Sequence, residues 1–465
     1  MNEKPLALLP ELILLLGAVA TLLSGSFLPR RRQGVAGLVA ALALAGSAAV
    51  ALAGRSDQTV YGHSFAIDVA TSAIRVLAPT ATLLVLLLAT PRIAGNRRQT
   101  EFYVLALLAT LGAQMLAGSS DLLVLAVGYL LATVPLYGLA GWGRDAGAAE
   151  AALKLYLFGA LAGVVMLGGV GLLYASAGGT RYDELASGLP AAPRGLVVVG
   201  VVGVLTGLLF KAGAAPLHFW VPDTVHGATA GAGAVLTTVP KVGALVAAYR
   251  LVTVIPADDG WPVFVAAVAA VTMTLGNLAA LAQTVPQRLL AYSTISQVGY
   301  LLMAVAVAGH RDALPALLVY LAAYALANVG AFAVVAATPG RRRLSDYRGL
   351  ARRRPAVAAA LVVCLLGLVG TPPTAVFLGK LTVFEAAWDG GWGWLVVLAA
   401  VNTVVSLAYY LRWLVPVFAA SPDPSPAGSA GRSAELAAVV AAAAVLLAGL
   451  AGGALYDAVG GTLLR

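Results

Sequence analysis

Residues 193–223 read PRGLVVVGVVGVLTGLLFKAGAAPLHFWVPD, and this stretch indicates the class of protein. It begins with an apolar run of about twenty residues, the length of a helix that crosses the hydrocarbon core of a bilayer. Lys211, Gly213 and Pro216 then follow within six residues. Proline interrupts a helix, and a break at membrane depth is tolerated where it is buried in protein or lines a wet cavity. The stretch therefore predicts a broken membrane helix with a lysine at the break.

Similar apolar runs recur along all 465 residues, of which 60% are hydrophobic and 11% are charged. An ordinary soluble domain has about 25% charged residues and cannot bury so many apolar helices. The sequence therefore predicts an all-α, polytopic integral membrane protein of about 14 transmembrane helices. The expected spans are 6–28, 34–54, 69–91, 102–118, 121–140, 151–175, 193–214, 228–252, 261–282, 288–308, 313–337, 356–387, 393–418 and 434–457.

Arginines gather in every second connection between these spans, the asymmetry that the positive-inside rule describes. The inside clusters would be Arg30–Arg32, Arg92 with Arg97 and Arg98, Arg144, Arg288, and the seven arginines of 341–354. This count gives an even number of crossings with the N-terminus outside. The net charge of +9 then reports membrane topology rather than nucleic-acid binding. A bacterial inner membrane and contact with the lipid bilayer are expected.

A second break follows at 367–374, which reads GLVGTPPT and is followed by Gly379 and Lys380. The two breaks lie five helices apart, and an odd-numbered repeat must insert with opposite orientation. Two inverted five-helix repeats are therefore expected. The expected parts are 1–101 (helices 1–3), 102–255 (first repeat), 256–418 (second repeat) and 419–465 (an inside loop and the last helix).

The lysines are placed differently from the arginines. Only five of the 29 basic residues are lysines, and Lys154, Lys211, Lys241 and Lys380 fall inside apolar segments. A charged lysine at the bilayer centre costs about 2.5–3.5 kcal/mol, whereas neutralising one at pH 7 costs roughly 4–5 kcal/mol. Because these costs are similar, such a lysine can accept and release a proton. The alternative is that these lysines reach an interface or form static ion pairs.

Other polar residues support a relay less specifically. Lys154 follows Glu150 by one helical turn, so the two form either a relay or a simple i,i+4 pair. His218 lies just past the first break and titrates near neutrality, although a lone histidine is often structural. The hydroxyls and amide of 292–297 could hold water or join helices. A single cysteine, Cys364, cannot ligate an iron–sulfur cluster, which needs about four thiolates.

Several motifs together resemble the antiporter-like membrane subunits of bacterial respiratory complex I, and most closely its N subunits. The resemblance covers most of the chain. Its most specific stretch is Phe210–Asp223, and the others follow in the order of the family. These are LPEL at 9–12, EAALKLYLFGA at 150–160, LAYSTISQVGY at 290–300 and GTPPTAVFLGK at 370–380.

The resemblance implies a fourteen-helix fold with a half-channel in each inverted repeat. It implies that Lys211 is the central proton carrier of the first half. Lys241 matches the family's eighth-helix lysine, and Lys380 matches its twelfth-helix lysine on the exit side. It also implies that NAD, FMN, iron–sulfur clusters and quinone bind to partner membrane and peripheral subunits. This chain would carry no cofactor and would convert a signal from them into proton transfer.

One position departs from the family, which normally has a glutamate in the fifth helix as the partner of the seventh-helix lysine. Here that position is Leu130. Without the carboxylate, the charged form of Lys211 would be less stable. Two alternatives to a proton pump therefore remain. The chain could be a non-pumping structural subunit, or a cation/proton antiporter or membrane-hydrogenase subunit of the same fold.

Overall fold

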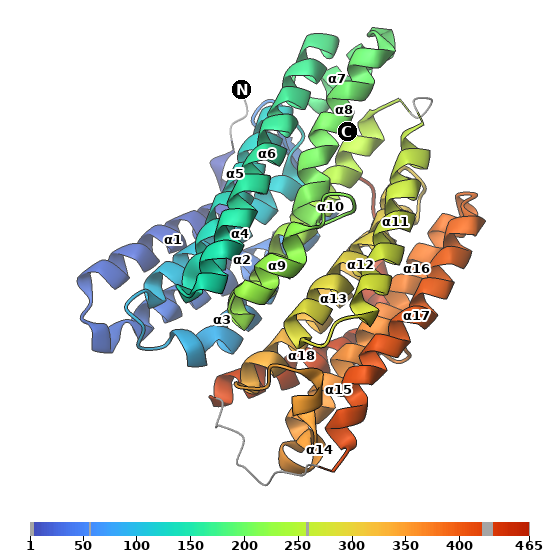
Figure 1. Ribbon diagram of the computed structural model, residues 1–465. Coiled ribbons are helices and arrows are strands. Elements are labelled where there is room, and N and C mark those ends of the chain that lie inside the picture. The colour runs from blue at the N-terminus through green and yellow to red at the C-terminus, as the bar shows by residue number, and fades with distance from the viewer. Residues whose placement is uncertain (1–3, 55–56, 257–259, 421–430, 465) are drawn as a thin grey trace.

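The structure is a computed structural model that describes residues 4–54, 57–256, 260–420 and 431–464. Long helices run side by side through the molecule (Figure 1). Within the described ranges, 13 helices are long and apolar enough to cross a membrane. They are α1 (Leu9–Phe27), α2 (Gly34–Ala53), α3 (Val69–Ile93), α4 (Gln99–Gly118), α5 (Leu122–Ala140), α6 (Ala146–Ala177), α8 (Arg194–Ala212), α10 (Ala230–Val254), α11 (Trp261–Leu281), α12 (Pro286–Ala306), α13 (Ala313–Ala337), α17 (Gly393–Phe418) and α18 (Arg432–Leu450).

Two crossings are broken where the sequence predicts breaks. After α8 the chain turns and continues as α9 (Trp220–Gly227), and α15 (Pro355–Val369) is followed by α16 (Ala375–Asp389). The first half of each broken helix ends at a glycine with left-handed backbone, α8 at Gly213 with φ +78° and α15 at Gly370 with φ +92°. Glycine adopts this conformation without a steric penalty, so it ends a helix readily. With α15 and α16 counted as one crossing, the expected fourteen-helix membrane fold is confirmed.

The connections hold short elements that the sequence did not suggest. A hairpin of β1 (Gln58–Val60) and β2 (Phe65–Ile67) is a small addition to the all-α fold. Its turn is possible because Tyr61, Gly62 and His63 all have positive φ. The short helices are α7 (Tyr182–Gly188), α14 (Leu350–Arg353), α19 (Gly452–Ala458), and the 3-10 turns η1 (Pro5–Leu8), η2 (Arg30–Arg32), η3 (Gly141–Gly143), η4 (Leu189–Ala191) and η6 (Leu344–Tyr347).

The packing repeats between the two halves of the chain. In the first half α4 packs on α5 and α6 packs on α8, while in the second α11 packs on α12 and α13 packs on α15. The seventh crossing (α8–α9) and the twelfth (α15–α16) are five crossings apart, so they run in opposite directions. The central helices α10, α12 and α13 contact one another and are almost entirely buried.

Helix α6 is longer than the predicted span 151–175 because both of its ends are capped. The Asp145 carboxylate accepts a hydrogen bond from the Ala148 amide at 2.8 Å, which starts the helix early. Gly178 ends it with a left-handed backbone at φ +78°.

The C-terminal end of the chain returns to the start of α3, where the Leu464 amide donates to Asp68 Oδ2 at 3.1 Å. An even number of crossings places both termini on one side, as Figure 1 shows. The expected inside loop before the last helix falls largely on 421–430, which lie outside the described residues.

Candidate functional site

Three lysines lie inside the helix bundle. Lys211 is in the last turn of α8, Lys241 is in the middle of α10, and Lys380 is in the second turn of α16. Each has an exposed fraction of 4% or less. Because a buried charge without partners is costly, the acceptors around each ammonium decide what the site can do.

Lys211 is held by neutral groups of α5. Its Nζ donates to the Ala132 carbonyl at 3.4 Å and lies 5.1 Å from the centre of the Tyr129 ring. The Tyr129 hydroxyl donates to the Gly159 carbonyl of α6 at 3.3 Å, which fixes the ring beside the lysine. A cation over a desolvated aromatic face is stabilised by up to about 2 kcal/mol. These two neutral groups therefore favour the charged form of Lys211 where the structure provides no carboxylate within the described residues.

Leu130 does not face this lysine. It lies on the outer surface of α5 with 47% of its area exposed, in line with Val127 and Val134. Within the described ranges Lys211 forms no ion pair. Leu130 stands at the position of the family's glutamate, but in this structure the groups of α5 that contact the Lys211 ammonium are the Tyr129 ring and the Ala132 carbonyl. Helix rotation explains the difference, since neighbouring positions point about 100° apart.

Lys241 binds the end of α8. Its Nζ donates to the Ala212 carbonyl at 2.6 Å. Ala212 is the last residue of α8, and the last carbonyls of a helix lack partners within it and form the negative end of its dipole. A Cβ atom on Gly213 would lie 2.9 Å from this ammonium. Glycine is therefore needed there for the lysine to approach as well as for the positive φ.

Lys380 repeats this arrangement in the second half. Its Nζ donates to the carbonyl of Val369, the last residue of α15, at 2.8 Å. It also lies 4.2 Å from the centre of the Tyr300 ring and 3.4 Å from Thr403 Oγ1. A Cβ atom on Gly370 would lie 2.9 Å from the Lys380 side chain. Both breaks thus supply a free helix end, and a lysine occupies each.

Neutral polar groups extend from Lys241 into the second half. Thr237 lies one turn before Lys241 on α10. Asn328 of α13 donates to Thr237 Oγ1 at 2.8 Å and to Thr238 Oγ1 at 2.9 Å. The Thr294 hydroxyl of α12 donates to Asn328 Oδ1 at 3.4 Å. These contacts join α10, α13 and α12 by hydrogen bonds.

The same line of groups reaches the second break. Gln297 lies one turn beyond Thr294 on α12, and its Nε2 donates to the Leu368 carbonyl at 2.8 Å. The Tyr320 hydroxyl donates to Gln297 Oε1 at 2.6 Å. Leu368 precedes the residue whose carbonyl holds Lys380. Buried hydrogen-bonding groups thus extend from Lys241 to Lys380.

Lys154 and Glu150 form a separate, partly exposed cluster. Lys154 Nζ lies 2.7 Å from Glu150 Oε1 and 2.8 Å from Asp223 Oδ2, and Arg288 Nη1 lies 3.2 Å from Asp223 Oδ1. The predicted Glu150–Lys154 pair is present, and the structure adds Asp223 and Arg288. His218 lies between α8 and α9, and in the described ranges it has no hydrogen bond to any of the lysines.

Sequence reasoning missed two buried ion pairs. Arg75 of α3 bonds both oxygens of Glu11 at 2.7 and 2.8 Å. Arg250 of α10 lies 2.5 Å from Asp68 Oδ1 and also donates to the Ala117 carbonyl at 2.6 Å. The signal for both pairs was an isolated arginine within an apolar span, because such a charge requires a partner.

Comparison with known proteins gives a consistent result. The family described as NADH:quinone oxidoreductase/Mrp antiporter, TM, matches residues 119–406. NADH-quinone oxidoreductase subunit N of Mycobacterium sp. (strain JLS) is 50% identical over 464 residues, with 98% of each chain covered. Subunit N 1 of Streptomyces griseus is 52% identical over 465 residues, with 99% of this chain and 98% of the relative covered.

Solved structures share the fold. A chain of respiratory complex I from Thermus thermophilus matches with a TM-score of 0.85 and 36% identity, over 97% of this chain and 100% of that chain. A chain of the Mrp complex from a Dietzia species matches with a TM-score of 0.87 over 97% of this chain and 96% of that chain, but its 22% identity supports the fold alone. The expected family is thereby confirmed: the chain belongs to the NADH-quinone oxidoreductase subunit N family of antiporter-like membrane subunits of respiratory complex I.

Proposed function

We propose that this chain translocates protons as a membrane subunit of NADH:quinone oxidoreductase, with Lys211, Lys241 and Lys380 as the groups that take up and release them. The observation that carries the proposal is that each ammonium bonds a backbone carbonyl. An arginine would stay charged in such a place, whereas a lysine can lose its proton. The partner carbonyl stays neutral in both states, so deprotonation leaves no buried charge behind.

The proposed order of transfer follows the contacts. Lys211 and Lys241 are linked through Ala212, which follows the first in sequence and binds the second. The line of groups through Asn328 and Gln297 then leads toward Lys380. Hydroxyl and amide groups bind water and pass hydrogen bonds on, so they suit a proton path better than apolar packing would.

The partly exposed cluster suits a different role. Two carboxylates, Glu150 and Asp223, favour the charged form of Lys154, and Asp223 is shared with Arg288. These contacts tie α6, α9 and α12 together. We assign Lys154 and Glu150 to anchoring the first broken helix rather than to the relay. His218 at the same break remains a candidate relay group.

We further propose that NADH, FMN, iron–sulfur clusters and quinone bind to partner subunits. The sequence has one cysteine, and Cys364 is buried against Gly330. The arginine clusters favour an inner-membrane orientation with the N-terminus outside. The second candidate function is a non-pumping structural subunit, and the observation that favours it is that Lys211 forms no ion pair within the described ranges.

The deciding experiment measures NADH-driven acidification of inverted membrane vesicles, normalised to NADH oxidation, and compares the variants with the wild type. We expect Lys211→Ala and Lys211→Arg both to lower the proton yield per NADH, because arginine keeps the charge but cannot release the proton. Arg31→Ala removes an exposed cation at an inside turn and serves as the control. An unchanged yield in both Lys211 variants, with the complex assembled, would support the structural role instead.

A further inference from the structure

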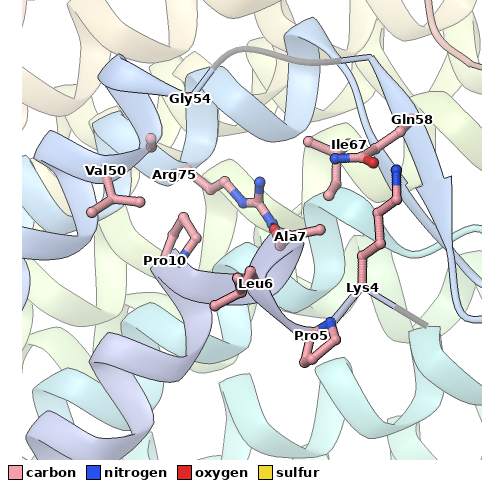
Figure 2. A pocket seen from close by; sticks show the side chains of 11 residues that line it. Lys4, Pro5, Leu6, Ala7, Pro10, Val50, Gly54, Gln58, Ile67 and Arg75 are labelled. Carbon is pink, nitrogen blue, oxygen red and sulfur yellow. The ribbon is translucent and has the colours of Figure 1, made fainter. Parts of the chain in front are cut away.

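A pocket of about 600 Å³ opens where the chain enters α1, beside the end of α2 and the β-hairpin (Figure 2). Apolar side chains form most of its wall, including Leu6, Pro10, Val50 and Ile67. Its polar groups are Lys4, Gln58 and Arg75. None of these groups belongs to the proposed proton path.

Arg75 brings a positively charged group to the inner part of the pocket. The residue is 3% exposed, and two of its guanidinium nitrogens are already bonded. Nε and Nη2 donate to the Glu11 carboxylate, and Nη2 also donates to the Ala7 carbonyl at 3.0 Å. Nη1 has no hydrogen bond within the described ranges, and Figure 2 shows the guanidinium directed into the space between Ala7, Gly54 and Ile67.

The charge of the pocket favours an anion. The negative charge of Glu11 cancels the positive charge of Arg75, so the Lys4 ammonium gives the pocket a net positive charge. Lys4 is exposed at the mouth of the pocket. A ligand with acceptor oxygens would complete the bonding of Arg75 Nη1, and guanidinium groups bind phosphate oxygens well.

The position of the pocket identifies the kind of anion. It lies where α1 begins and α2 ends, which is the level of the lipid headgroups for membrane-spanning helices. Its rim continues into exposed apolar side chains, with Leu6 77% and Leu52 57% exposed. Acyl chains would cover such a surface, whereas a free anion would gain nothing from it. We propose that this pocket binds the headgroup of an anionic phospholipid, with the phosphate between Lys4 and Arg75.

A photoactivatable phosphatidylglycerol tests this in the intact complex, with peptide mapping of the cross-linked sites. We expect labelling of residues 4–10 and 50–54 to exceed that by a matched phosphatidylcholine. Unlabelled phosphatidylglycerol should compete, and inorganic phosphate should not. Lys4→Gln should weaken the labelling about fivefold, the factor for about 1 kcal/mol per lysine at an anionic lipid surface. Arg31→Gln removes the same charge at the other end of α1 and should have no effect.

Other outcomes would overturn the assignment. Equal labelling by the two lipids would indicate ordinary lipid contact without headgroup recognition. Competition by inorganic phosphate would indicate a free-anion site. Cross-links from this segment to a partner subunit, with none to lipid, would show that protein covers the pocket. Labelling of the Lys4→Gln variant equal to that of the wild type would show that Lys4 does not bind the lipid. None of these outcomes depends on whether the chain pumps protons.

Discussion

Replacement of Tyr129 by leucine tests whether an aromatic ring has taken the place of a carboxylate beside Lys211. The ammonium lies 5.1 Å from the ring centre and both groups are buried, so the upper range of a cation–π contact applies. Loss of about 2 kcal/mol changes the balance between charged and neutral lysine about 30-fold, or about 1.5 pH units.

The direction of the change follows from the chemistry of the ring. Its face attracts the ammonium and not the neutral amine, so its loss destabilises only the protonated form. A carrier that must be protonated before each transfer then fails at lower pH than in the wild type. We expect the upper pH limit of proton pumping to move down by about 1–1.5 units.

The assay is the proton yield per NADH in inverted vesicles, measured over a series of pH values. Tyr129→Phe keeps the ring and loses only the 3.3 Å hydrogen bond to Gly159, so its profile should stay close to wild type. Lys211→Ala provides the reference for the lowered proton yield. A Tyr129→Leu profile that coincides with wild type, while Lys211→Ala loses pumping, would refute the role of the ring and leave that of the lysine intact.

Three further predictions concern other parts of the bundle. Asp68→Asn leaves Arg250 buried without its counter-charge, so the free energy of unfolding should fall by about 3–5 kcal/mol. The unfolding temperature should therefore be lower, and an unchanged temperature would contradict the buried pair. Gly370→Ala places a side chain at a positive φ, which costs about 1–3 kcal/mol, and it crowds Lys380. The proton yield should therefore fall without loss of NADH oxidation. A normal yield would argue against the close approach of Lys380 to Gly370. Asn328→Leu interrupts the polar line and should lower the yield in assembled complex, whereas full pumping would show that protons take another path.

The crossings and their breaks could be predicted because their signals are local. An apolar run of about twenty residues defines a span, and Gly213 and Gly370 lie directly at the ends of their half helices. Buried lysines could be predicted for the same reason, since a charge inside an apolar run is visible in the sequence. The β-hairpin was missed because two three-residue strands are too short to give a pattern.

The partners of the lysines could not be predicted in this way, because they come from distant helices. Tyr129 and Lys211 meet only because α5 packs near α8, and Thr237 meets Asn328 only because α10 packs on α13. The orientation of Leu130 shows a related limit. A sequence match fixes which residue stands at a position, but the rotation of the helix decides which way that residue points.

The breaks and the lysines are best understood as parts of one arrangement. Glycine and proline end a helix inside the membrane, and this leaves a backbone carbonyl without a partner at the negative end of the helix dipole. Lys241 and Lys380 each fill that place, at Ala212 and Val369. A carboxylate partner would hold the proton tightly and would become an unpaired buried charge once the lysine lost it. A carbonyl partner stabilises the ammonium yet stays neutral afterwards, and this is the reason why both sites suit the proton-carrying role proposed above.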